Sequence, residues 1–125
     1  MKKIIESEKA PKPIGPYSQA VLVDDTLYIS GCLGMDFETG LLKESIEMQT
    51  ELAIINLKEI LLKANMDLSN VVKTTVFITN MDDFSKVNSV YADYFVNDCP
   101  ARSCVEISKL PKNALVEIEA IAKKS

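Results

Sequence analysis

Arg102 is the residue that most strongly suggests chemistry, because it stands at the entrance of an apolar strand in the segment CPARSCVEI, residues 99–107. Its guanidinium is always charged and presents a rigid fork of donors that matches a carboxylate or a phosphate. An arginine at a strand entrance that faces a cleft is therefore a candidate anion-binding residue. The alternative is a surface arginine in an ion pair, which contributes ~0 to 1 kcal/mol to stability.

Cys104 is expected beside Arg102, because residues two apart along a strand share one face. A neighbouring cation lowers the pKa of a thiol and makes the thiol reactive. The alternative is that Cys104 is a small packing residue within an apolar strand. The residue pattern leaves both interpretations open.

Four further polar residues could complete a site. Glu117 and Glu119 fall on the polar face of the last predicted strand, where they are either solvated or line a cleft with one of them as a general acid–base. Tyr17, in the loop segment GPYSQ, either donates its hydroxyl or packs. Asn88 lies on the aromatic face of a predicted helix, where it either bonds a neighbouring loop or anchors a ligand.

Composition excludes several classes of site. The chain contains no histidine, so triads in which histidine activates a serine or a cysteine are excluded. The net charge is −4 and the basic residues are scattered, so we do not expect nucleic acid as a partner. Cys32, Cys99 and Cys104 fit neither a zinc-site spacing nor a disulfide framework, so we expect free thiols and no metal.

Chain length and hydropathy indicate the number of domains and whether the protein contacts a membrane. We expect the 125 residues, 47% of them apolar, to form one domain, residues 1–125, around one core. No apolar run approaches the ~20 residues of a membrane-spanning helix. The first residues carry lysines without a sustained apolar segment behind them, unlike a secretory signal. We therefore expect a soluble cytoplasmic protein without membrane contact.

The chain alternates strand-like and helix-like segments. A hairpin is predicted over residues 20–23 and 26–30, a helix over 45–64, a strand over 71–79, a helix from Asp82, and strands over 103–107 and 115–122. We expect an α+β fold in which two helices cover one face of the sheet. The strands are apolar on both faces, so the second face predicts a homo-oligomer with small-molecule sites between subunits.

The apolar face of the first predicted helix is broad. Ser45 is the expected N-cap, and the helix is expected to stop near Asn65. The residues that we expect on its buried face share a helical spacing; they are Met48, Leu52, Ile54, Ile55, Leu57, Leu61 and Leu62.

Several segments together resemble the reactive intermediate deaminase family, RidA or YjgF, and the resemblance spans nearly the whole chain. The matching segments are IGPYSQA (14–20), YISG (28–31), NVVKTTV (70–76), PARS (100–103), LPK (110–112) and EIEAIA (117–122), together with Ala10 and Pro11. Their order and spacing make the resemblance specific.

The resemblance implies a chorismate-mutase-like protomer, a homotrimer with a site at each subunit interface, and hydrolysis of enamines and imines such as 2-aminoacrylate to 2-keto acids and ammonia without a cofactor. It implies that Arg102, Glu117 and Tyr17 are catalytic and that Arg102 binds the substrate carboxylate. The pocket-lining residues that it implies are Ser30, Gly31, Asn88 and Cys104.

One departure and three alternatives remain. Many relatives carry glutamine after the Ser–Gly pair, whereas this chain has Cys32, which alters substrate range only if the position touches the ligand. A protein that binds 2-keto acids without turnover would use the same arginine. An RNA-directed nuclease or translation inhibitor is disfavoured by the charge and the lack of histidine. A holdase-type chaperone is disfavoured because the sequence has neither a disordered arm nor an evident apolar patch.

Overall fold

The computed structural model describes residues 1–125 as a six-stranded mixed sheet with two helices, which confirms the α+β fold. Along the chain the elements are β1 (Lys2–Ile5), β2 (Ala20–Val23), β3 (Thr26–Leu33), α1 (Ile46–Lys63), β4 (Val71–Ile78), α2 (Phe84–Tyr94), β5 (Ala101–Glu106) and β6 (Val116–Lys123). Every predicted helix and strand is present. The sequence interpretation missed β1, in which only Ile5 is buried.

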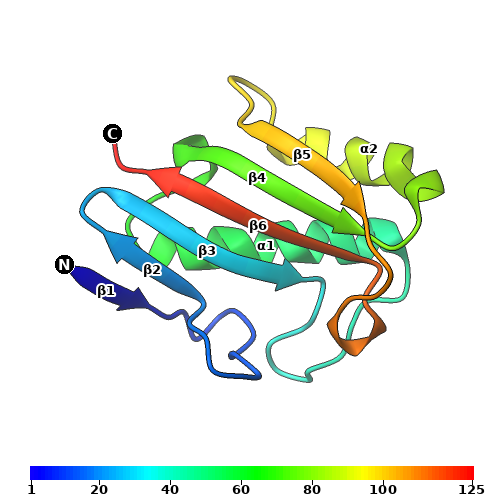
Figure 1. The fold of residues 1–125 in the computed structure, drawn as a ribbon, viewed down its shortest axis with the longest axis horizontal. Helices are drawn as coiled ribbons and strands as arrows, with labels where there is room; N and C mark the ends of the chain where they lie inside the picture. The colour runs from blue at the N-terminus through cyan, green and yellow to red at the C-terminus, as the bar shows by residue number, and fades with distance from the viewer.

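The strand order is β1-β2-β3-β6-β4-β5, so the last strand of the chain lies at the centre of the sheet. Neighbouring strands are antiparallel except β4 and β5, which are parallel and are joined through α2. Both helices pack on one face of the sheet, behind it in Figure 1, and β5 forms an edge. This topology places β3 and β6 side by side and separates both from β5.

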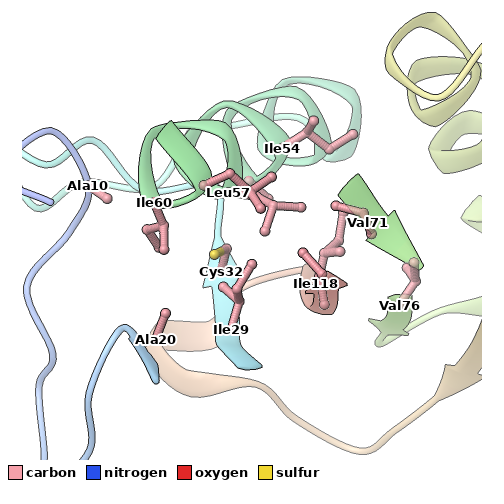
Figure 2. Packing of buried hydrophobic residues seen from close by; sticks show 14 of the residues in the cluster. Ala10, Ala20, Ile29, Cys32, Ile54, Leu57, Ile60, Val71, Val76 and Ile118 are labelled. Atoms are coloured by element: carbon pink, nitrogen blue, oxygen red, sulfur yellow. The ribbon is translucent and has the colours of Figure 1, made fainter. Parts of the chain in front are cut away.

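The main core lies between α1, α2 and the covered face of the sheet. It contains 24 buried residues, and Figure 2 shows how Ile29 and Cys32 of β3 and Ile118 of β6 lie opposite Leu57 of α1. Leu57 and Ile118 are fully buried. Burying side chains of this size contributes roughly 1.5 to 3 kcal/mol each, so this layer holds β3 and β6 against α1.

Helix α1 begins and ends as the sequence predicts. The Ser45 hydroxyl oxygen accepts a hydrogen bond from the Met48 amide at 3.1 Å, which satisfies an otherwise unpaired donor of the first turn. At the other end Asn65 takes a positive φ of 60°, a conformation that asparagine tolerates at helix ends. The cap fixes where the helix starts relative to the loop before it.

The buried face of α1 differs from the prediction in three places. Met48, Ile55 and Leu62 were expected in the core, but they are 49%, 38% and 64% exposed. The buried face instead includes polar residues, among them Gln49 and Asn56. Their side-chain amides bond backbone groups of neighbouring segments, which removes the cost of burying them.

The opposite face of the sheet has no helix over it. Apolar side chains lie on this face and remain exposed, with Tyr28 50% and Val105 41% accessible, and Glu117, Glu119, Lys73 and Thr75 lie among them. This side of the sheet is its open face. Neither helix is long and apolar enough to cross a membrane.

Candidate functional site

Arg102 lies on the covered face of the edge strand β5, against α2. Its Nη1 donates a hydrogen bond to Asn88 Oδ1 at 2.7 Å. Its Cζ lies 4.9 Å from the ring centroid of Tyr91 and 5.5 Å from that of Phe84, within the range of cation–π attraction. Arg102 forms no salt bridge, so the ion-pair alternative does not describe it. The guanidinium is held in place while several of its donors stay free for a ligand.

Asn88 and Cys104 both lie beside Arg102, Asn88 on α2 and Cys104 on β5. The Asn88 side-chain oxygen accepts a hydrogen bond from Arg102, whereas the alternative expected from the sequence was a bond to a neighbouring loop. Cys104 lies on the same face and packs against the main core. Burial raises the pKa of the Cys104 thiol, and the Arg102 charge opposes that rise only in part. The packing interpretation therefore describes this thiol better than the reactive one.

Glu117 lies on the open face of β6, where its side chain packs directly over Gly31 of β3. A Cβ at Gly31 would lie 2.7 Å from Glu117 Oε2, so only glycine leaves room for this carboxyl. Burial and then the neighbouring Glu119 charge raise the pKa of Glu117 above its ordinary value. A carboxyl tuned in this direction is suited to proton transfer nearer to neutral pH.

A β-bulge gives β3 its shape beside Glu117. The register of β3 against β6 shifts between Ile29 and Cys32, so Ser30 and Gly31 lie in the irregular part of the strand. The Ser30 hydroxyl donates to the Ser18 carbonyl at 2.6 Å, which ties the bulge to the preceding loop. Bulges of this kind re-aim side chains and are frequent next to active sites.

These residues line a cavity of about 370 Å³. Tyr17, Ser30, Gly31 and Glu117 are all in its wall, as the resemblance implied for one site. The Tyr17 side chain is 49% exposed, and its hydroxyl oxygen accepts a long hydrogen bond, 3.5 Å, from the Ile14 amide. The volume suits a small organic molecule.

Two further residues of the cavity wall were not singled out from the sequence. Gln19 is 4% exposed and binds the backbone of the segment before it: its Oε1 accepts from the Ser7 amide at 2.7 Å, and its Nε2 donates to the Pro11 carbonyl at 2.9 Å. It therefore holds the loop that carries Tyr17. Asn56 of α1 is 2% exposed and donates to the carbonyls of Leu33, the last residue of β3, and of Met35. The signals available in the sequence were a glutamine in the loop segment GPYSQ and an asparagine on the apolar face of a predicted helix.

Cys32 also lies in the cavity wall, at the boundary with the core, and is 6% exposed. Burial, together with the Glu117 charge, raises the pKa of its thiol to about 12. The thiol is therefore neutral at physiological pH and behaves as a small apolar group.

The seven predicted site residues form two groups within one chain. Tyr17, Ser30, Gly31 and Glu117 line the cavity, whereas Asn88, Arg102 and Cys104 do not. Glu117 faces the open side of the sheet, since it alternates with buried Val116 and Ile118, and Arg102 faces α2 on the covered side. Strand β4 also separates β6 from β5. One chain cannot bring Arg102 and Glu117 to the same small ligand.

The fold and the cavity define a small α+β protein with a sheet covered on one face and a tuned carboxyl in a pocket at the bulge of β3. The sequence matches the family model described as Endoribonuclease L-PSP over residues 7–124. The chain belongs to this family, the YjgF/RidA family, as the resemblance indicated.

Relatives and solved structures agree with this assignment. A Bos taurus protein named 2-iminobutanoate/2-iminopropanoate deaminase is 51% identical over 123 residues, which cover 98% of this chain and 90% of that protein. A Yersinia pestis structure described as a member of the conserved Rid protein family has a TM-score of 0.96 at 49% identity, covering 99% and 100% of the two chains. The structure of Escherichia coli TdcF with bound serine has a TM-score of 0.93 at 38% identity, covering 98% and 99%.

Proposed function

We propose that this protein hydrolyses 2-imino acids, and the enamines that tautomerise to them, to 2-oxo acids and ammonia without a cofactor. The observation that carries the proposal is the half-buried Glu117 carboxyl, whose pKa is raised, in a cavity with Tyr17, Ser30 and Gly31. In a chain without histidine such a carboxyl is the best candidate for proton transfer. Relatives 46% to 51% identical and named 2-iminobutanoate/2-iminopropanoate deaminase support it.

The complete site is proposed to form between copies of the chain in a homotrimer. Arg102 and Glu117 face opposite sides of the sheet in one copy, so a ligand that touches both must lie between two copies. A ring in which the cavity of each copy faces Arg102 of the next uses two different surfaces, as closed cyclic assemblies with more than two subunits do. The exposed apolar side chains of the open face, including Tyr28 and Val105, supply a surface that such a ring would bury.

Arg102 of one copy would bind the substrate carboxylate through paired charge-assisted hydrogen bonds. That contact fixes the adjacent C=N carbon near Glu117 of the neighbouring copy. A water oxygen then bonds to this carbon of the protonated imine, the C=N π pair moves to the nitrogen, and ionised Glu117 takes one water proton. Glu117 returns this proton to the nitrogen of the resulting carbinolamine, the C–N bond breaks, and ammonia leaves. The hydroxyl proton passes to the Glu117 carboxylate as the C=O bond of the 2-oxo acid forms. Tyr17 is assigned a hydroxyl contact and closure of the cavity.

The first test uses 2-aminoacrylate made in situ by a serine dehydratase, with pyruvate formation measured against time. We expect the wild-type protein to accelerate pyruvate formation, and Arg102→Ala to match the reaction without added protein. As a control, Arg102→Ala should have the oligomer size of the wild type and a melting temperature close to it, so that a lost rate reflects the site and not unfolding. If wild type, variant and blank give the same rate, deamination of this substrate is excluded.

A non-catalytic protein that binds small carboxylates is the second candidate. The observation that favours it is the TdcF structure with bound serine, because serine carries a carboxylate beside a nitrogen-bearing carbon. Calorimetric binding of serine or a 2-oxo acid to the wild type, without any acceleration of imine hydrolysis, would assign this function instead. Nucleic acid is not proposed as a partner, since the net charge of −4 gives no positive footprint for phosphates.

The cytoplasm is the proposed location. The three cysteines are all free, and Cys99 is exposed. Exposed thiols persist in compartments where glutathione and thioredoxin keep them reduced.

A further inference from the structure

The cavity extends beyond the residues proposed for the reaction. Its wall contains residues from both faces of the sheet: Glu117 from the open face, and Asn56 and Ile60, one helical turn apart, from α1 on the covered face. The part of the cavity beside α1 is its inner end. The other walls of this inner end come from Cys32, Leu33 and Met35. The whole cavity, about 370 Å³, holds the liquid volume of roughly ten water molecules.

Asn56 is the polar group of the inner end. Both of its amide hydrogens are used, because Nδ2 donates to the Leu33 and Met35 carbonyls at 3.0 Å each. Since both partners are acceptors, the nitrogen must face them and the orientation of the amide is fixed. Oδ1 accepts no hydrogen bond from the chain, yet no fully enclosed side-chain oxygen or nitrogen lacks a partner. The 2% of Asn56 that remains accessible therefore serves an acceptor that faces the cavity.

We infer that the inner end of the cavity is a side-chain subsite in which Asn56 Oδ1 accepts a hydrogen bond from a 2-imino acid with a neutral amide or hydroxyl side chain. The inference rests on the proposed function, because it assumes that the reacting carbon lies near Glu117. Apolar walls from Met35 and Ile60 accept the methylene part of such a side chain.

Charge excludes other side chains from this subsite. Among the charged residues of the cavity wall, Glu117 and Glu119 outnumber Lys12, so the wall disfavours an acidic side chain. A basic side chain would find only the neutral Asn56 at the inner end, and burying an unpaired charge is costly. The Cys32 thiol stays neutral and contributes no charge. The cavity wall therefore favours a side chain that ends in a neutral hydrogen-bond donor.

The test compares two imines whose side chains have the same size. An L-amino-acid oxidase of broad specificity makes the imines of asparagine and of leucine in situ, and the decay of each imine is followed with and without the protein. We expect the wild-type kcat/KM to be roughly three- to tenfold higher for the asparagine imine, the effect of one neutral hydrogen bond. In Asn56→Leu this ratio should fall to about one.

A matched control and a second variant keep the test decisive. Gln49→Leu removes another buried amide from α1, one that bonds the Lys43 carbonyl and the Leu115 amide and does not line the cavity, so its ratio should remain that of the wild type. Ile60→Phe fills the inner end without altering Asn56. It should lower kcat/KM for both imines relative to the alanine imine, even if Asn56→Leu does not fold.

The outcomes separate the subsite from the reaction. If the wild type accelerates decay of the alanine imine but treats the asparagine and leucine imines alike, the subsite is refuted and the deaminase proposal stands. An unchanged ratio in Asn56→Leu also refutes the subsite. If no imine is accelerated, the proposed function fails and the substrate assignment fails with it.

Discussion

Replacing Arg102 by lysine tests the carboxylate contact most directly, because it keeps the charge and removes the fork. A lysine ammonium can offer one strong hydrogen bond to a carboxylate oxygen where the guanidinium offers two in parallel. One lost charge-assisted bond corresponds to about 1.5 to 3 kcal/mol. At about 1.4 kcal/mol per tenfold change, we expect kcat/KM for 2-iminopropanoate to fall roughly 10- to 150-fold.

The fold should tolerate this change. Lysine also loses the 2.7 Å bond to Asn88 and part of the contact with the Tyr91 and Phe84 rings, which together stabilise the protein by about 1 to 2 kcal/mol. The melting temperature should therefore fall by a few degrees, and the oligomer size measured by light scattering should stay that of the wild type.

The assay is pyruvate formation from dehydratase-generated 2-aminoacrylate at several substrate supply rates. Lys86→Gln is the matched control, because Lys86 lies on α2 near Asn88 and its side chain is 55% exposed. That variant removes a positive charge from the same helix and should keep the wild-type rate. Wild-type activity in Arg102→Lys would refute the paired contact with the carboxylate.

Three further predictions concern the same residues. In Gly31→Ala the new methyl displaces the Glu117 carboxyl, the end of a flexible side chain, so kcat/KM should fall at least about 10²-fold while the melting temperature changes little; a normal rate would contradict the role of Glu117. Glu119→Gln removes a charge that raises the Glu117 pKa, so the acid limb of the kcat/KM profile should move to lower pH, and an unmoved limb would assign that limb to another group. Asn88→Ala leaves the Arg102 guanidinium less fixed and should raise KM more than it lowers kcat, as initial rates would show; an equal effect on both constants would argue against a role in substrate binding.

Most of the secondary structure could be predicted from local patterns. The alternation in the last predicted strand, residues 115–122, and the capping serine before α1 act through neighbouring residues, and both the strand and the cap were confirmed. β1 could not be recognised, because four residues with one buried side chain carry no period. The prediction that Met48, Ile55 and Leu62 are buried was wrong because hydropathy does not show which polar residues find hydrogen-bond partners. Asn56 finds carbonyl partners and is buried on this helix instead.

The candidate site could also be predicted only in part: the sequence indicated its main residues but not how the fold places them. The strand-entrance position singled out Arg102 and the alternation of the last strand singled out Glu117 and Glu119. The family resemblance then chose Glu117 over Glu119, and the structure gives Arg102 and Glu117 each a suitable environment. Their placement on opposite faces depends on β6 inserting between β3 and β4, a pairing between distant segments that no local pattern contains. Gln19 and Asn56 escaped notice because their partners are backbone groups, which leave no signature in side-chain types.

Arg102 is the only arginine in the chain, so its place beside Asn88 gives the protein a single chemically addressable guanidinium. An α-dicarbonyl reagent that condenses with guanidinium groups can add there once per chain, and intact mass then counts occupied and free sites directly. A carboxylate bound at Arg102 would slow this addition without being turned over. Protection from the reagent would therefore report binding independently of hydrolysis, in the wild-type protein and without a mutation.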